Sequence, residues 1–569
     1  MPIKGLHVND FAELRKSIYL NHGPDDPEGY LRLARALSTQ ADELDTELKD
    51  MAILQAYSQA RELGDSPYAA AAEEHALKAL KERAGSSPYI DRYLYTAFRG
   101  RDRQEEGRGR IAETGPMRAT IVQPLFYGDP VSPGGASGGG LGTLIRSLGR
   151  AMARRGLPVL TLAAQSADAQ GGALPSSETL DEGHELRRLP LALLERNPKA
   201  FLLAYRRIEA AAEAALRVYA GAGSIVHIRY LDDASRAAAY AARQLKLSIA
   251  LTLTPDPHRG VCGPDGRIAL RGIEDTRELF NRILIGDELL GWSRGLVGIG
   301  RNAFIDTLPE FFPQLEDARG IARAGIDEGV DTAEILPIGD PARLLCDPAL
   351  ALPLDPSRLD EPAIICVGRL NALKGQVNLA RAWAAGPLRK RWNLILIGGE
   401  LDMPSDEERA QRDGIRALLS RDTEGKLCQL PSQDNAVVRR LLAWWGSRRP
   451  ATGSDLYVCP SIKEEFGLSI LEAMAAGLPV CAPLNGGARS YLRHGVNGFL
   501  VDTRDAASLG RELSALFRQN ALEQDRLESL RTEAKHSVEE SYSLESMAAK
   551  YQGFYERLLN GKESQNERA

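Results

Sequence analysis

Two successive runs of alternating strand and helix patterns constrain this chain more than any other feature of its sequence. The first run begins near Met117, where an apolar stretch leads into a glycine-dense turn, an amphipathic stretch at 143–156 and a second apolar stretch at 157–164. The second run begins at residues 363–370, AIICVGRL. Strands that alternate with helices are typical of parallel sheets covered by helices on both faces. The pattern therefore predicts two doubly wound, Rossmann-like α/β domains.

The chain has 569 residues, which is too long for a single hydrophobic core, so the pattern predicts several domains. The predicted parts are a helical extension over 1–115, a first Rossmann-like domain over 116–343, a second over 344–530, and a C-terminal helix and tail over 531–569 that pack back across the domains. The extension is predicted to be helical because its apolar residues recur every three to four positions.

Composition excludes several classes of protein. The formal net charge of -6 gives no general attraction to nucleic acid or to an anionic membrane. No uninterrupted apolar run reaches eighteen residues and the N-terminus has no signal-like apolar region, so we expect a cytoplasmic protein without an integral membrane segment. The six cysteines form no Cys-x-x-Cys pair, which argues against a disulfide framework and a zinc site.

The glycine-dense turn SGGGLGTLI, at 137–145, follows the first predicted strand. Glycines between a strand and a helix let backbone N–H groups approach an anion at the N-terminus of the helix. The spacing does not fit Gly-x-Gly-x-x-Gly, so a dinucleotide fingerprint is not predicted. A flexible connection without a ligand remains an alternative.

A pair of cations follows the first strand of the second run. Arg369 and Lys374 lie in VGRLNALKGQ, where the chain leaves a buried strand and enters a helix. Two cations at the carboxyl edge of a parallel sheet, near a helix N-terminus, favour a diphosphate site. The alternative is a solvated surface pair.

Two carboxylates surround the start of a later helix in EEFGLSILEAMAAGLPV, at 464–480. Glu464 is predicted in the loop and Glu472 about one turn into the helix. The pair could be an acid/base couple, two binding groups for sugar hydroxyls, or a helix-capping acid with a surface charge. The apolar neighbours of Glu472 require a polar partner for its carboxylate, which a polyol would supply.

Together these motifs resemble the retaining GT-B glycosyltransferases of family 4, in the branch of sucrose-phosphate synthase and sucrose synthase. The resemblance covers roughly 117–560 and includes LNGGARSYLRHGVNGFLVD at 484–502. The segment from His227 to Thr254 is also similar to that branch. The resemblance implies two Rossmann-like domains facing a central cleft, with the acceptor on the side of the first domain and the donor on the second.

The resemblance also implies roles for individual residues. Arg369 and Lys374 would hold the donor diphosphate and stabilise the charge on it as it leaves. Glu464 would contact hydroxyls of the transferred sugar, and Glu472 would bind the ribose. The remaining donor-binding residues implied by the resemblance are Gly138, Gly139, Phe466, Gly467 and Leu468.

The acceptor side departs from the family pattern. The family places a histidine after the strand that ends near Thr254, but this chain has Asp256 at that position and His258 two residues later. We favour His258 as the catalytic histidine, with Asp256 as the alternative. Asp232 and Arg259 are further acceptor-side candidates.

The implied reaction transfers a hexose, with glucose favoured, from a nucleoside diphosphate sugar to a small sugar or sugar phosphate. UDP- or ADP-glucose is the expected co-substrate, with no tightly bound cofactor and no obligatory metal. The N-terminal helices are candidates for a homo-oligomer contact. Alternatives are a polyol, glycerate, lipid or polysaccharide acceptor, a GT-B epimerase or phosphorylase, and a scaffold with a decayed transferase domain.

Overall fold

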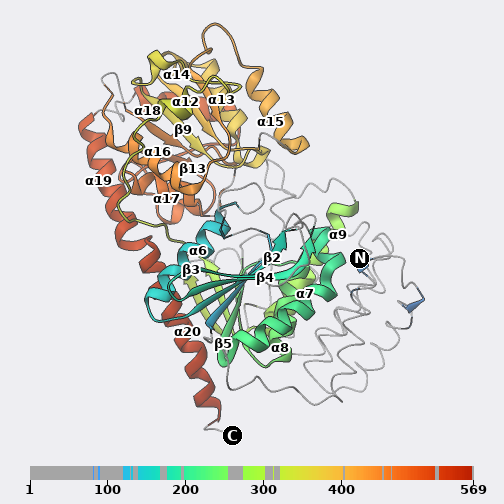
Figure 1. The fold of residues 1–569 in the computed structure, drawn as a ribbon. Coiled ribbons are helices and arrows are strands. Elements are labelled where there is room, and N and C mark those ends of the chain that lie inside the picture. The colour runs from blue at the N-terminus through green and yellow to red at the C-terminus, as the bar shows by residue number, and fades with distance from the viewer. Residues whose placement is uncertain are drawn as a thin grey trace, which may run out of the picture. The chain divides into compact units, whose positions relative to one another are not determined.

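The computed structural model divides the chain into two compact units (Figure 1). Unit 1 comprises Met1–Tyr127, Met152–Ile326 and Tyr551–Ala569, and unit 2 comprises Gly128–Ala151 and Asp327–Lys550. The structure describes residues 78, 81–82, 88–89, 92, 119–127, 130–131, 139–166, 176–193, 198–253, 273–300, 312, 315, 321–400, 404–450, 454–462, 464, 466–518 and 524–566. Most of the predicted helical extension, together with Gly138, Asp256, His258 and Arg259, lies outside these residues.

Unit 1 is built on an eight-stranded sheet with the order β3-β4-β2-β1-β5-β6-β7-β8. Its strands are β1 (Ala119–Leu125), β2 (Val159–Ser166), β3 (Ser176–Asp181), β4 (His184–Leu193), β5 (Ala220–Ile228), β6 (Ser248–Leu253), β7 (Gly295–Ile299) and β8 (Ala322–Ile326). All neighbours are parallel except the β3–β4 hairpin. The interior strand β6 is buried along its whole length, as expected for a strand covered on both faces.

The helices α7 (Pro198–Tyr219), α8 (Asp233–Gln244) and α9 (Ile273–Trp292) belong to unit 1, whereas α6 (Gly139–Arg154) belongs to unit 2 as far as Ala151. Helix α7 packs against α8, and α8 packs against α9. The final helix α20 (Leu544–Asn566) also contributes to unit 1 from Tyr551 onward. A Cβ atom added at Gly295 of β7 would lie 2.5 Å from Leu558 Cδ2, so the absence of a side chain there lets α20 approach the sheet closely.

Unit 2 contains a six-stranded sheet that is parallel throughout, with the order β11-β10-β9-β12-β13-β14. Its strands are β9 (Ala363–Val367), β10 (Asn393–Ile397), β11 (Leu427–Leu430), β12 (Leu456–Val458), β13 (Val480–Pro483) and β14 (Phe499–Val501). Strand β9 comes first in the chain and lies in the middle, and the connections run outward on both sides of it. This is the doubly wound order, whose switch point between β9 and β12 is where ligands bind in open α/β sheets.

Helices of unit 2 connect and cover these strands. They are α12 (Ala342–Leu345), α13 (Gln376–Ala385), α14 (Leu388–Arg391), α15 (Asp406–Arg416), α16 (Asn435–Ser447), α17 (Leu468–Ala475), α18 (Ala506–Arg518) and α19 (Gln524–Ser541), with 3-10 turns η3 (Pro356–Arg358), η4 (Ala372–Lys374) and η5 (Gly487–Ser490). Helix α15 begins with a capping box, in which Ser405 and Glu408 satisfy each other's backbone N–H groups. None of the helices described in either unit has the length and apolar character to cross a membrane.

Candidate active site

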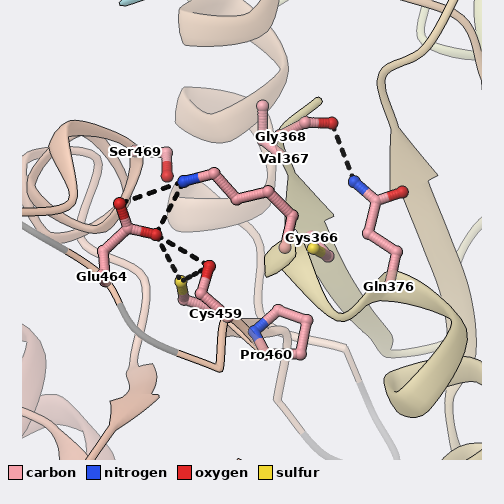
Figure 2. Close-up of a pocket in the computed structure, with 10 residues that line it drawn as sticks. Cys366, Val367, Gly368, Gln376, Cys459, Pro460, Glu464 and Ser469 are labelled. Carbon is pink, nitrogen blue, oxygen red and sulfur yellow. Dashed lines mark hydrogen bonds and ion pairs between the residues drawn. The ribbon is translucent and has the colours of Figure 1, made fainter. Parts of the chain in front are cut away.

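A small pocket lies at the switch point of the unit 2 sheet (Figure 2). Its volume is about 200 Å³, part of which is open to solvent. The walls come from the carboxyl ends of β9 and β12 and from the first turns of α13 and α17. The lining residues are Cys366, Val367, Gly368, Lys374, Gln376, Cys459, Pro460, Ser461, Glu464 and Ser469.

Lys374 and Glu464 meet in this pocket as an ion pair. Lys374 Nζ donates to Glu464 Oε1 at 3.0 Å and to Oε2 at 2.7 Å. The Lys374 side chain is 28% exposed and that of Glu464 is 8% exposed. Figure 2 shows the Glu464 carboxylate turned toward Cys459, the residue directly after β12. The structure thus joins one predicted phosphate-binding cation to one predicted sugar-binding carboxylate.

Local backbone structure fixes Lys374. The Asn371 side chain accepts a hydrogen bond from Lys374 N at 2.9 Å and thereby caps the 3-10 turn η4. Gly375 then adopts a φ of 67°, and a Cβ atom there would lie 2.2 Å from Pro460 O. Only glycine fits this left-handed, crowded position, which brings the loop after β9 against the loop after β12.

Glu464 is held from its backbone as well as its side chain. It forms a β-bridge with Gly486, and Gly487 N donates to Glu464 O at 2.7 Å. Ser461 Oγ donates to Glu464 Oε2 at 2.7 Å. The Cys459 thiol lies 3.7 Å from the same oxygen. Burial and the Glu464 charge raise the pKa of Cys459 to about 11, so Cys459 remains a thiol at neutral pH and can donate weakly.

Arg369 differs from Lys374 in its surroundings. It lies two residues beyond the end of β9, is exposed, and its side chain has no hydrogen bond or ion pair to any residue that the structure describes. An unpaired guanidinium two residues beyond a parallel strand is well suited to a mobile anionic ligand. Arg369 is not part of the pocket wall.

Glu472 lies on α17 and is partly buried. Its Oε1 accepts from Asn435 Nδ2 at 2.8 Å. Burial raises the pKa of Glu472 above its ordinary value, although the hydrogen bond from Asn435 and the charge of Arg439 oppose that rise. Glu472 does not line the pocket that contains Glu464, so the structure gives the two carboxylates separate partners.

The start of α17 combines a backbone turn with an aromatic cluster. Gly467 has a φ of 90° and precedes the first helical residue, Leu468. Phe466 is 2% exposed, and its ring packs against Tyr491, whose hydroxyl donates to Phe466 O at 2.6 Å. The Phe466 side chain is therefore part of the core, while the backbone N–H groups that follow it open the helix.

Gly139, which belongs to unit 2, is the first residue of α6, whereas Asp232 and His227 belong to unit 1. Asp232 caps α8, with Oδ1 accepting from Ser235 N at 2.6 Å. His227 is fully buried between the Tyr555 hydroxyl and Thr252 Oγ1, at 2.6 and 2.7 Å, which is the arrangement of a structural histidine. Within the described residues, no three His, Cys, Asp or Glu side chains are close enough together to hold a metal ion.

Sequence reasoning missed several groups of this site. Ser461, Asn371 and Asn435 position Glu464, Lys374 and Glu472 respectively. A serine three residues before a loop carboxylate and an asparagine three before a loop lysine are signals for local side-chain hydrogen bonds. No comparable signal identifies Asn435, because it reaches Glu472 from a different helix.

Comparisons with known proteins bear on this site. Residues 355–536 match the model of the family described as "Glycosyl transferases group 1". The match includes both Lys374 and Glu464 and supports the predicted glycosyltransferase class for this segment. A sucrose synthase from Nitrosomonas europaea is 28% identical over 240 residues, which are 42% of this chain and 28% of that protein. The chain thus matches less than a third of that relative's length.

Two solved structures establish the fold. The sucrose-phosphate synthase from Thermosynechococcus elongatus has a TM-score of 0.59 and 22% identity, covering 78% of this chain and all of that one. The protein HepE of Anabaena, solved with UDP and glucose, has a TM-score of 0.51 and 17% identity, covering 77% of this chain and 99% of that one. The predicted α/β fold of the GT-B type is confirmed by these likenesses.

Proposed function

We propose that this chain is a retaining glycosyltransferase that moves a hexose from a nucleoside diphosphate sugar to a small sugar or sugar-phosphate acceptor. The observation that carries the proposal is the Lys374–Glu464 ion pair at the switch point of the unit 2 sheet. The pair supports the proposal because a single bound nucleotide sugar could reach both a cation suited to phosphate and a carboxylate suited to sugar hydroxyls. The match to group 1 glycosyl transferases over the same residues supports this class.

The donor is proposed to be a UDP- or ADP-hexose, with glucose as the favoured sugar. Lys374 and the exposed Arg369 bind the diphosphate and stabilise the negative charge that grows on it as the bond to the sugar breaks. Glu464 accepts hydrogen bonds from hexose hydroxyls, and Glu472 accepts them from the ribose. The HepE structure, with UDP and glucose bound to a protein of the same fold, supports a uridine nucleotide.

Transfer is proposed to occur on the front face of the hexose. The anomeric carbon–oxygen bond to the diphosphate breaks while a bond forms to the acceptor oxygen, and the acceptor proton passes to the departing phosphate oxygen. No carboxylate nucleophile takes part, so Glu464 and Glu472 are not a glycosidase pair. Their separate partners, Lys374 and Asn435, support two binding roles.

A donor-by-acceptor screen tests the function. UDP-, ADP- and GDP-glucose are combined with fructose, fructose 6-phosphate, glycerol phosphates and glycerate, and the released nucleoside diphosphate is measured. We expect release that depends on one acceptor. Lys374→Ala is expected to lower kcat/KM about 100- to 1000-fold, because it removes a donor that acts on the charge of the transition state.

Lys390→Ala and Glu512→Ala are matched controls, because both residues are exposed in the same unit and lie on α14 and α18, away from the pocket residues. Both controls should keep the activity of the unaltered protein. Full activity in Lys374→Ala would show that the active site has been assigned to the wrong residues. Failure of every donor to bind would reject the transferase function itself.

A further inference from the structure

The pocket contains a charge pair that the proposed donor has to separate. Lys374 is assigned to the diphosphate and Glu464 to the hexose, yet each neutralises the other at 2.7 Å. If the carboxylate stays paired with the lysine ammonium, the lysine contributes less free energy to diphosphate binding. The carboxylate and the diphosphate then compete for the same positive charge. The pair therefore opposes phosphate binding until Glu464 finds other hydrogen-bond donors.

We propose that the Lys374–Glu464 pair makes the pocket discriminate between a nucleoside diphosphate sugar and the same nucleoside diphosphate without its sugar. Hexose hydroxyls supply the O–H donors that replace Lys374 on Glu464, and Lys374 is then released to the diphosphate. A nucleoside diphosphate alone has no hexose hydroxyls, and its ribose hydroxyls are assigned to Glu472, so it brings no such donors to Glu464. The inference rests on the proposed function and specifies how the donor site distinguishes its substrate from its product.

Glu464 cannot escape the competition by moving into solvent. Its carboxylate is fixed by Ser461 Oγ at 2.7 Å, and its backbone is bridged to Gly486, where a Cβ atom would lie 2.2 Å from Glu464 O. The residue is only 6% exposed. A carboxylate held at such a buried position needs a compensating partner whenever its cation leaves. Lys374, at 28% side-chain exposure, is the more exposed member of the pair and can turn toward a ligand with less loss of packing.

Arg369 provides the contrast. Its exposed guanidinium is not paired with any carboxylate of the residues that the structure describes. It therefore contributes equally to the binding of the nucleoside diphosphate sugar and of the nucleoside diphosphate alone. Lys374 contributes fully only when a hexose occupies Glu464. After transfer the hexose leaves with the acceptor, Lys374 returns to Glu464, and the hold on the nucleoside diphosphate weakens. The pair thus favours release of the product.

Calorimetric titration tests the inference. UDP, ADP, GDP and their glucose derivatives are titrated into the unaltered protein, Glu464→Gln, Lys374→Met and the double variant. In Glu464→Gln we expect the affinity for the free nucleoside diphosphate to rise roughly tenfold, a change of about 1.4 kcal/mol. The affinity for the glucose derivative should not rise, so the ratio of the two affinities collapses. In the Lys374→Met background the Glu464→Gln effect should vanish.

Glu472→Gln is the control, because Glu472 is paired with the neutral Asn435 rather than with a cation. This variant should lower the affinity for both ligands by a similar factor. Thermal unfolding of each variant checks that it is folded. If Glu464→Gln does not fold, Lys374→Met alone decides the question: it should weaken the glucose derivative severalfold more than the free nucleoside diphosphate.

The outcomes separate the two proposals. An unchanged affinity ratio in Glu464→Gln, or equal losses for both ligands in Lys374→Met, overturns the coupling and leaves the transferase function standing. If the unaltered protein binds none of the six compounds, the proposed function fails, and the coupling fails with it.

Discussion

Asp232 carries both a structural role and a titration that can be measured. It caps α8 through the Ser235 backbone N–H, and only 6% of it is exposed. Burial raises the pKa of Asp232 from 3.8 to about 6, although the hydrogen bonds from Ser235 oppose the rise. Between about pH 4 and pH 6 the folded chain therefore holds this proton more tightly than the unfolded chain does. The resulting stability is lost as the pH rises through that window.

We predict that Asp232→Asn flattens the pH dependence of stability. The amide oxygen still accepts from Ser235 N, but no buried charge forms, so the variant should be more stable than the unaltered protein above pH 6, by up to about 3 kcal/mol. Apparent melting temperatures at pH 4.5 and 7.5 measure this. Asp232→Ala, which loses the cap, should instead cost about 1 kcal/mol. Parallel pH profiles for Asp232→Asn and the unaltered protein would contradict the prediction.

Individual residues of the site were predictable where a motif fixed both residue type and spacing. Lys374 and Glu464 come from such motifs, and the structure brings them together. Cys459 belongs to no such motif, and the sequence assigns it no place in a site. Its thiol instead lies on the pocket wall near Glu464. Contacts of this kind depend on the register of β12 against β9, which local spacing does not encode.

At the scale of secondary-structure elements, Asp455 connects β12, α16 and β9. It lies before β12 with a side chain 0% exposed, and it accepts from Arg448 at the end of α16 at 2.6 and 2.7 Å. It also accepts from Ala363 N, the first residue of β9, at 2.8 Å. Arg448 in turn donates to the backbone oxygens of Leu359 and Glu361. The junction thus depends on one buried carboxylate.

We predict that Asp455→Ala destabilises unit 2 by about 3–5 kcal/mol, because it leaves a largely buried guanidinium without its counter-charge. Urea unfolding followed by tryptophan fluorescence is suitable, since Trp383 and Trp445 are both buried in this unit. Asp422→Ala is the control, because Asp422 is 72% exposed and its pair with Arg389 should contribute less than about 1 kcal/mol. Equal midpoints for the two variants would contradict the prediction.

Elements with strong periodicity were predictable, and short or exposed ones were not. The amphipathic stretch at 143–156 corresponds to most of α6, Gly139–Arg154. The β3–β4 hairpin was not predicted, because its exposed strand β3 is polar and carries no buried-strand pattern. Strand β11 has only four residues and follows a turn-rich stretch, so its apolar signal is brief. Both lie at sheet edges, where burial leaves the weakest imprint on sequence.

At the scale of the whole molecule, Arg92 ties the N-terminal region to the sheet unit. Its guanidinium pairs with Asp233 of α8 at 3.0 Å, with side chains only 1% and 2% exposed. Asn281 of α9 completes the cluster, accepting from Arg92 at 2.6 Å and donating to Asp233 at 2.8 Å. The N-terminal region therefore supplies the counter-charge for a carboxylate inside unit 1.

We predict that deleting residues 1–115 destabilises unit 1 by about 3–5 kcal/mol, because Asp233 is left as a buried charge without its cation. Arg92→Met in the full chain should have a similar effect. Asp233→Asn in the deleted chain should recover part of the loss, since the uncompensated charge is gone. Melting followed by circular dichroism measures all three. The role would be refuted if the deleted chain had the same melting temperature as the full chain, or if Asp233→Asn did not raise the melting temperature of the deleted chain.

The division of unit 1 into three chain segments has a consequence for synthesis on the ribosome. Tyr551, Tyr555 and Leu558 cover β5 and β7, yet they follow the whole of Asp327–Lys550. At the usual pace of translation that stretch takes on the order of ten seconds to under a minute. During this interval His227 and the surface around Gly295 are not yet covered by α20. Unit 1 therefore leaves the ribosome first, but its packing is completed only when the last segment of the chain has been made.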